Sequence, residues 1–177
     1  MDNPESPAPA IVPPDDPARS LTHVRPEDSA LQHISIAGDT YTILISGAET
    51  AGKYCLIDML VPPGGGPPPH RHDFEEMFTI LDGEVQFTFR GENVTVRAGE
   101  TINIPANAPH FFHNVSAATV RMLCMCSPAG QEQFFAATGD LVPDRTSPPP
   151  DLNEKEKAER VARAKALAPQ YRTELLI

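Results

Sequence analysis

Four side chains in the middle of the chain have the types and the spacing of metal ligands: His70, His72, Glu76 and His110. Neutral imidazole is the commonest protein donor to first-row divalent ions, and these ions also accept carboxylate oxygen. Taken singly, a histidine in a proline-rich loop or on an apolar strand is usually solvated or an ordinary core residue. The joint pattern instead favours one site that binds a divalent metal ion through three imidazoles and one carboxylate.

The spacing also predicts how a fold presents these ligands. Side chains of equal parity on a strand share a face, so His70, His72 and Glu76 point the same way. His110 lies 34 residues beyond Glu76, which leaves room for a hairpin and a return strand. We expect the four ligands to meet in one pocket. The strand that carries Glu76 also has apolar side chains on the ligand face, namely Phe74, Phe78 and Ile80, so this face should point into an apolar interior.

The other histidines are interpreted as ordinary residues. His113 has the opposite parity to His110 on the same expected strand, so it should point away from the metal. His23 and His33 precede the motifs and have no partner at a ligand spacing.

The ligands belong to two longer motifs. The first reads G-x5-H-x-H-x3-E-x6-G over residues 64–83, and the second reads G-x5-P-x-N-x2-H-x3-N over residues 99–114. They resemble the two motifs of the cupins, small β-barrel proteins that hold a divalent metal. Asn107 stands where that family usually has glycine, and asparagine tolerates a left-handed backbone better than other non-glycine residues. The resemblance implies an all-β fold, a single cupin barrel (double-stranded β-helix or jelly roll) with short C-terminal helices, and metal ligation by His70, His72, Glu76 and His110.

Composition divides the 177 residues into three parts. Residues 1–20 combine proline with acidic side chains and predict an extended arm. Residues 21–140 are the expected barrel, and residues 141–177 a proline-rich linker and C-terminal helix. Alternating polarity between turn signals predicts strands at 31–37, 40–46, 54–61, 71–81, 84–90, 93–98, 101–104, 109–115 and 119–126.

Helix is expected only near the end of the chain. Residues 130–139 predict a short helix that ends at Gly139, with Phe134 and Phe135 available to close one end of the barrel. Residues 151–168 predict a longer helix with Asp151 as its N-cap and Pro169 after its end. Its weak apolar stripe predicts packing against the barrel or a second subunit, with a solvated helix as the alternative.

Charge and cysteine content restrict the partners and the compartment. The 14 basic and 24 acidic residues give a formal net charge of −10, which argues against nucleic acid or an anionic membrane as partner. Three cysteines, an odd number, favour a reducing cytoplasm over a disulfide scaffold. Cys124 and Cys126 share a face of the last expected strand, where they would enter the barrel near the metal or serve as small core residues.

Within the cupins, three segments resemble the quercetinase-like group, the bacterial flavonol dioxygenases and their relatives: PPGGGPPPHRHDFEEMFTILDGE, PANAPHFFHN and SPAGQEQFFAATG. The resemblance implies a dioxygenase that cleaves an enol-containing aromatic or diketone-type small molecule, with Glu76 as catalytic base. The metal is left open among Fe, Ni, Mn, Co, Cu and Zn.

Two other functions use the same ligands: a metal-dependent isomerase or lyase, and a module that binds a small ligand without turnover. Because the family commonly pairs, we expect a homodimer. The expected substrate-binding residues, which would otherwise be core residues, are Phe74, Phe87, Phe89 and Phe112.

Overall fold

The computed structural model describes residues 12–177, and most of its regular structure is β-strand. The strands are β1 (His33–Ile36), β2 (Asp39–Ile45), β3 (Cys55–Val61), β4 (His70–His72), β5 (Glu75–Asp82), β6 (Glu84–Phe89), β7 (Glu92–Arg97), β8 (Thr101–Ile104), β9 (His110–His113), β10 (Val120–Ser127), β11 (Asp140–Val142) and β12 (Thr173–Leu175). The helices are α1 (Gly47–Thr50), α2 (Gln131–Thr138), α3 (Glu154–Leu167) and the 3-10 turn η1 (Ala168–Tyr171).

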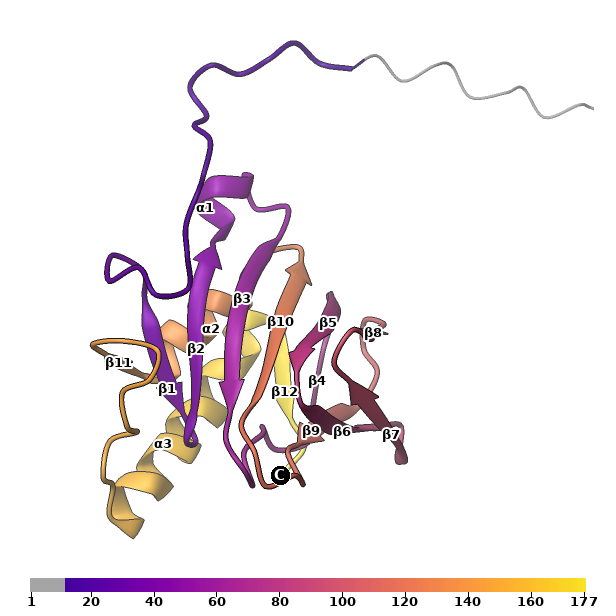
Figure 1. The fold of residues 1–177 in the computed structure, drawn as a ribbon, viewed down its shortest axis with the longest axis vertical. Coiled ribbons are helices and arrows are strands. Elements are labelled where there is room, and N and C mark those ends of the chain that lie inside the picture. The colour runs from indigo at the N-terminus through magenta and orange to yellow at the C-terminus, as the bar shows by residue number, and fades with distance from the viewer. Residues whose placement is uncertain (1–11) are drawn as a thin grey trace, which may run out of the picture.

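The strands form two antiparallel sheets, which confirms the all-β prediction. One sheet has the order β11-β1-β2-β3-β10-β5-β8, and the other has the order β12-β4-β9-β6-β7. In Figure 1 the strands β1, β2, β3 and β10 run side by side through the centre of the molecule. The strand expected over 71–81 is in fact two, because the chain bends at Asp73 and Phe74 and crosses from one sheet to the other.

Alternating side chains from both sheets fill the space between them. On β10 every second residue is buried, beginning at Val120, and on β6 the buried pair is Val85 and Phe87. Three aromatic rings meet in the centre, with centroids 5.0 Å apart for Phe78 and Phe87 and 5.6 Å apart for Phe112 and each of the other two. This period of two is the pattern of a sheet with one face in the core.

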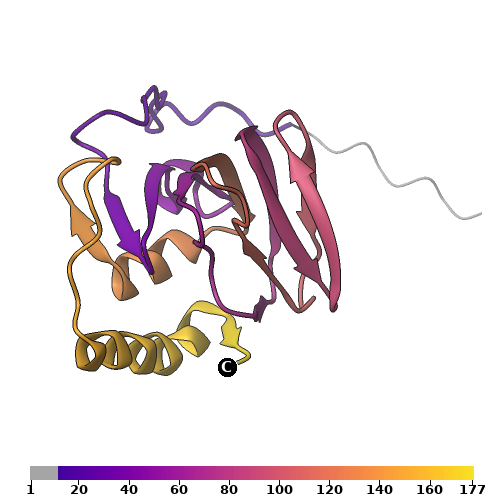
Figure 2. The same ribbon diagram turned by 60° about the horizontal axis from the view of Figure 1, so that its bottom comes forward.

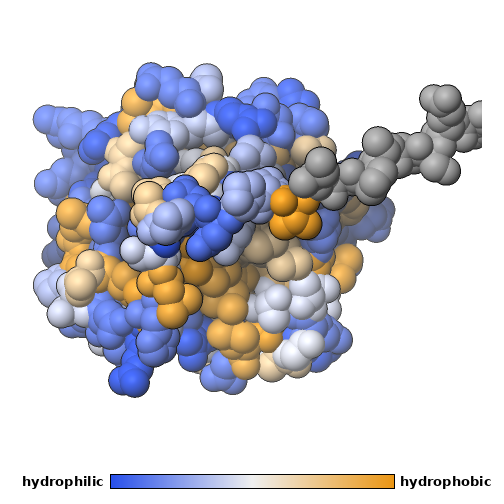
Figure 3. Space-filling view, turned by 90° about the horizontal axis from the view of Figure 1, so that it is seen from above, coloured by the Kyte–Doolittle hydropathy of each residue, from blue (hydrophilic) through white to orange (hydrophobic). Residues whose placement is uncertain are grey.

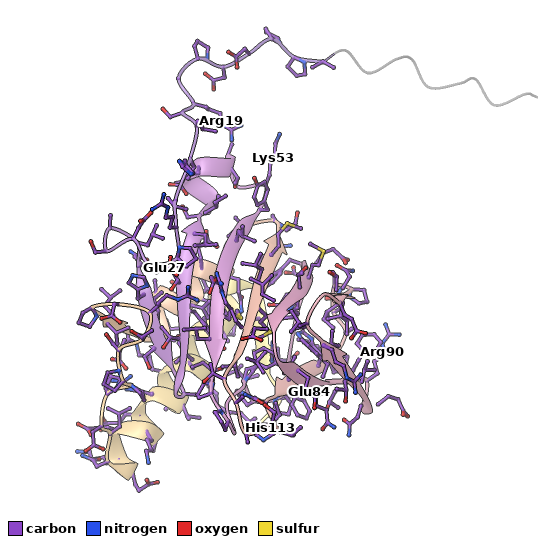
Figure 4. All side chains as sticks on the ribbon, viewed as in Figure 1. Arg19, Glu27, Lys53, Glu84, Arg90 and His113 are labelled. Carbon is purple, nitrogen blue, oxygen red and sulfur yellow. The ribbon has the colours of Figure 1, made fainter. Side chains whose placement is uncertain are left out.

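A buried polar cluster holds two outer segments against the larger sheet. Asp58 of β3 accepts hydrogen bonds from Arg121 at 3.0 and 2.8 Å and pairs with Arg145, which also contacts Glu27 at 2.9 Å. Glu27 lies in the segment before β1 and is labelled in Figure 4. These charge-assisted hydrogen bonds therefore hold the segment before β1 and the segment around Arg145 against β3. Of the expected N-terminal arm, residues 1–11 lie outside the described part, and residues 12–20 are exposed.

The two expected helices are present, and one has a different start. Helix α2 ends at Gly139 as predicted, and both Phe134 and Phe135 are buried. Helix α3 begins at Glu154 after Asn153, whose side chain accepts from the Glu156 amide at 3.0 Å. The prediction of Asp151 as N-cap is wrong, because Asn153 with Glu156 forms the reciprocal capping box.

The chain from residue 140 onward adds one strand to each sheet: β11 pairs with β1, and β12 pairs with β4. Figure 2 shows α3 along one edge of the molecule, close to β12 and to the C-terminus. Viewed from above, hydrophilic side chains cover most of the surface and hydrophobic ones form smaller patches (Figure 3). Within residues 12–177, every helix is too short or too polar to cross a membrane.

Candidate metal centre

The four expected ligands meet in the interior. His70 and His72 come from β4, Glu76 from β5 and His110 from β9, so the cluster joins the two sheets. One ligand atom from each of the four lies within 4.8 Å of those of the others, and all four residues are buried. His113, by contrast, is exposed, and Figure 4 shows it at the lower edge of the molecule. The parity argument therefore describes both histidines of β9 correctly.

The glycines before β4 let the chain reach the cluster. Gly66 has φ of +132°, and a Cβ at this position would overlap the carbonyl oxygen of Phe112 on β9. The same loop donates from the Gly64 amide to the Asn114 carbonyl at 2.8 Å and accepts from the Asn114 amide at 3.0 Å. Because only glycine allows this close approach of two backbones, the loop delivers His70 directly opposite His110, its register partner.

Asn107 keeps the turn that precedes β9. Its φ is +69°, in the left-handed region that the sequence argument allowed for asparagine. Its amide donates to the His72 carbonyl at 2.6 Å. The turn is thus tied to the strand that carries two of the ligands.

Backbone carbonyls orient the three imidazoles. The Nδ1 atoms of His70, His72 and His110 lie 2.8, 2.9 and 2.9 Å from carbonyl oxygens. These oxygens belong, in that order, to Pro68, Phe74 and Ala108. Since a carbonyl only accepts, each Nδ1 carries the hydrogen and the lone pair of a neutral ring is on Nε2. This tautomer is the one in which a histidine binds metal through Nε2 with an outer hydrogen bond that fixes its ring.

Glu76 is the centre of the cluster. Its Oε2 lies 3.0 Å from the Nε2 of His72 and 3.0 Å from the Nε2 of His110. Its Oε1 accepts from the Cys124 thiol at 3.2 Å and from the Cys126 thiol at 3.7 Å. Burial on its own would raise the pKa of Glu76, but the hydrogen bonds from the two imidazoles outweigh it and hold the pKa well below its usual value. The carboxylate is ionised at neutral pH.

The donor set fits a divalent ion. Burial and the neighbouring His110 lower the pKa of His70 to about 4, so its Nε2 lone pair is available at neutral pH. Burial also acts to lower the pKa of His110, but the hydrogen bond and charge of Glu76 outweigh that and raise it. With Nδ1–H on each ring, a hydrogen bond from Nε2 to Glu76 needs an extra proton on the imidazole. A cation in the place of those protons satisfies the same converging lone pairs, so His70, His72, Glu76 and His110 would hold it.

A cavity of about 580 Å³ opens beside the cluster, and His70 and Glu76 are part of its wall. Most of the wall is apolar and comes from both sheets, from α2 and from α3, with Met59, Phe78, Phe134, Phe135 and Val161 among its residues. Pro67 and Pro68 form part of the same wall just before the metal-binding strand. The candidate metal site therefore faces a space of the size that small-molecule ligands occupy.

The four phenylalanines expected to contact substrate have different places. Phe112 lines the cavity. Phe74 stacks on the His72 ring, with centroids 3.9 Å apart, and Phe87 is fully buried in the core. Phe89 is partly buried and has the Arg90 guanidinium 4.8 Å from its ring centre. Of these four residues, Phe112 is the one in the cavity wall, and its contact with substrate remains a prediction.

Asp39 and Tyr41 of β2 are among the polar cavity residues that the sequence argument missed. Alternation along β2 places both on the inner face with buried Ile43, so parity was the available signal. No sequence motif contains them. Their place in the cavity depends on the contact between β2 and the loop before β4, two segments that are far apart in the sequence.

Comparison with known proteins gives a family match within the barrel. The family model described as the cupin domain matches residues 57–126, a range that contains all four candidate ligands. Residues 57–126 form a cupin domain. The two sheets, the strand order and the position of the ligands agree with that assignment.

Two curated proteins and one solved structure illustrate what this cupin is similar to. Quercetin 2,3-dioxygenase of Bacillus subtilis is 28% identical over 128 residues, which are 72% of this chain and 37% of that protein. Polyketide synthase CurC of Streptomyces cyaneus is 30% identical over 94 residues, 51% of this chain and 60% of that protein. The structure of the polyketide cyclase RemF from Streptomyces resistomycificus matches with a TM-score of 0.55 at 20% identity, covering 86% of this chain and 96% of that one. The chain spans less than two thirds of both curated proteins, and the structural match establishes the fold alone.

Proposed function

We propose that this cupin is a metal-dependent enzyme that acts on an enol-containing small molecule, and that it is a dioxygenase of an aromatic or diketone-type substrate. The observation that carries the proposal is the position of His70 and Glu76 in the wall of an apolar cavity of about 580 Å³. A metal-binding group that is wholly enclosed by protein has a structural role, whereas one that faces a cavity leaves room for substrate. The similarity to a quercetin dioxygenase supports the choice of oxygen chemistry.

The chain's own residues have three tasks in this chemistry. A divalent ion held by the four ligands supplies Lewis acidity and redox capacity next to the cavity. The three imidazoles, each fixed by a backbone carbonyl, would hold it at one place, and the mostly apolar wall beside them would limit the access of water. Glu76, ionised and at the cavity wall, accepts the proton of the enol hydroxyl that approaches the cluster. Substrate oxygen then faces the cluster as an enolate.

A second reaction class has its own support. Enolisation of a ketone needs a Lewis acid and a base but no dioxygen, so the same site serves an isomerase, a lyase or a ring-closing enzyme. The observation in its favour is the 30% identity over 94 residues to a protein named polyketide synthase CurC. Both classes share the enol and the base, and they differ in whether oxygen is consumed.

Oxygen uptake separates the two classes. The protein is loaded in turn with Fe, Ni, Mn, Co, Cu and Zn, mixed anaerobically with a panel of flavonols, diketones and acireductones, and then exposed to oxygen. We expect one metal form to consume oxygen with one substrate group, and Glu76→Gln to lose this activity. His113→Ala is the matched control, because this histidine shares β9 with His110 but is exposed.

The outcomes assign the function. Oxygen uptake that requires Glu76 supports the dioxygenase. Conversion of the substrate without uptake replaces it with the second class. No uptake and no conversion with any metal contradicts an enzyme of either class on these substrates.

A further inference from the structure

A second polar position lies in the cavity, apart from the metal ligands. Asp39 and Tyr41 are two residues apart on β2, and alternation directs both inward together with Ile43. Both line the cavity that His70 and Glu76 also line, and their exposed fractions are 0% and 3%. The strand that carries them is three strands away from β5 in the larger sheet. The cavity wall also carries Asp140, Lys157 and Arg160, and Asp39 adds a buried carboxyl at a position separate from the metal ligands.

The Asp39 carboxyl is only half satisfied. Its Oδ2 accepts from the Tyr41 hydroxyl at 3.0 Å. Its Oδ1 is buried against Gly65 and has no hydrogen bond of ordinary geometry from the described residues. Burial raises the pKa of this carboxyl to about 7, against smaller opposite effects of the hydrogen bonds from the Tyr41 hydroxyl and from the Gly66 backbone amide. Oδ1 of this cavity-wall residue is thus left with at most a weak donor, the Gly66 amide.

An unpartnered buried acceptor needs an explanation, because native proteins satisfy nearly all such atoms. Among the described residues, the other buried side-chain atoms without a hydrogen bond belong to His33, Asp140 and Arg145. His33 and Arg145 are not part of the cavity wall, and Asp140 is at the cavity but forms an ion pair with Arg160. Asp39 is therefore the cavity residue whose free acceptor oxygen could take a hydrogen bond from a donor group of a bound ligand.

The environment of Tyr41 connects this position to the metal end. Its hydroxyl is held by Asp39, and burial, followed by the charge of Asp39 and more weakly that of Glu76, raises the pKa of Tyr41. Glu76 is one of the four candidate metal ligands, and both Tyr41 and Glu76 line the same cavity. A single ligand that lies in the cavity can therefore face both positions.

We propose that Asp39, positioned by Tyr41, binds a hydroxyl group of the substrate, while the enol oxygen of the same molecule faces the metal ligands. The hydroxyl hydrogen donates to Oδ1, and the apolar part of the molecule fills the space between the two positions. This inference rests on the proposed function for the enol end. It restricts the substrate class to hydroxylated aromatic enols, because a simple diketone has no second hydroxyl to donate.

Two flavonols that share the enol but differ in hydroxyl groups test the inference. Quercetin has hydroxyl groups beyond the enol, and 3-hydroxyflavone has the enol alone. Anaerobic titration of the metal-loaded protein measures the dissociation constant of each, and the metal content of every variant is measured in parallel. We expect quercetin to bind tighter. At pH 8, where Asp39 is ionised, we expect Asp39→Ala to lower this preference by roughly 10- to 100-fold, the range for a hydrogen bond to a charged group.

Further variants keep the test decisive. Asp39→Asn has the shape of the native side chain and serves if Asp39→Ala does not fold; it should lower the preference by a smaller factor. Asp140→Asn is the matched control on the same cavity wall, because Arg160 already pairs with that carboxyl. A weaker binding of quercetin, with the constant of 3-hydroxyflavone and the metal content unchanged, identifies a contact of Asp39 with the added hydroxyl groups, whereas a purely structural role predicts changes in both constants.

The failures are distinguishable. If both flavonols bind and their ratio is the same in the native protein and the Asp39 variants, the inference is wrong and the proposed function stands. If the metal-loaded protein binds neither flavonol, the proposed action on aromatic enols fails and the inference fails with it.

Discussion

The two polar parts of the cavity are built in opposite ways. At the metal end each imidazole Nδ1 has a carbonyl partner, and both oxygens of Glu76 have hydrogen-bond donors. At the other end, one oxygen of Asp39 is held by Tyr41 and the other has no hydrogen bond of ordinary geometry from the described residues. The first arrangement fixes lone pairs for a cation that stays, whereas the second leaves an acceptor for a group that arrives with the ligand. Variants at each end should therefore affect different measurements.

Removal of a metal ligand should have the largest effect. Even the loss of a hydrogen-bond partner of a ligand typically costs about 10–100-fold in metal affinity, so loss of the ligand itself in His110→Ala should cost at least about 100-fold. Calorimetric titration with a divalent ion measures this, and His113→Ala should bind as the native protein does. Equal metal affinity of the native protein and His110→Ala would show that this cluster is not the metal site.

The thiol beside Glu76 should have the next largest effect. Cys124 donates to Oε1 at 3.2 Å and so holds the carboxylate with Oε2 toward the imidazoles. Cys124→Ala should weaken metal binding by about 10–100-fold, and Cys124→Ser should restore most of it because a hydroxyl also donates.

Cys55→Ala is the control for this pair, since Cys55 is equally buried but its thiol is not one of the two that contact Glu76. Equal losses in the variants of Cys55 and Cys124 would show that packing, and not the hydrogen bond, is responsible.

The last expected effect is on a different quantity, the pH dependence of folding stability. The pKa of Asp39 is about 7 in the folded protein against an ordinary value of 3.8, so between these values the folded state binds more protons than the unfolded state. The free energy of unfolding should therefore fall as the pH rises through this window. Asp39→Asn lacks this contribution and should gain stability relative to the native protein by at most about 1.4 kcal/mol per pH unit, with no further gain above pH 7.

Urea unfolding of both metal-free proteins from pH 4.5 to 8 measures that difference. A constant difference across the range would mean that Asp39 is ionised throughout, and the two ends of the cavity would then not differ in the way described.

The sequence was informative where function depends on short-range order. Parity along one expected strand predicted that His70, His72 and Glu76 point the same way, and they do meet although that strand is divided between β4 and β5. The same rule directed His110 inward and His113 outward. The helix over 130–139 was predicted for the same reason, because its end at Gly139 is a local signal. Local rules of alternation and capping are physical constraints that a single segment carries by itself.

The rest depends on contacts between distant segments. The bend at Asp73 and Phe74 splits one expected strand between two sheets, and β12 pairs with β4 from 103 residues away at Arg71 and Glu174. Three of the four expected phenylalanines lie outside the cavity wall, because alternation predicts that a side chain is buried but not whether it packs in the core or lines the cavity. The burial of Asp39 at the cavity could not be predicted from β2 alone, because it depends on the loop before β4 lying against its carboxyl.

The central claim is that one divalent ion binds between the two sheets at the edge of the cavity. A crystal structure of the metal-loaded protein, with anomalous diffraction at the metal's absorption edge, tests it most directly. We predict one strong peak bonded to the Nε2 atoms of His70, His72 and His110 and to a carboxylate oxygen of Glu76. A peak elsewhere, or no peak at this cluster in a protein that contains metal, would contradict the account.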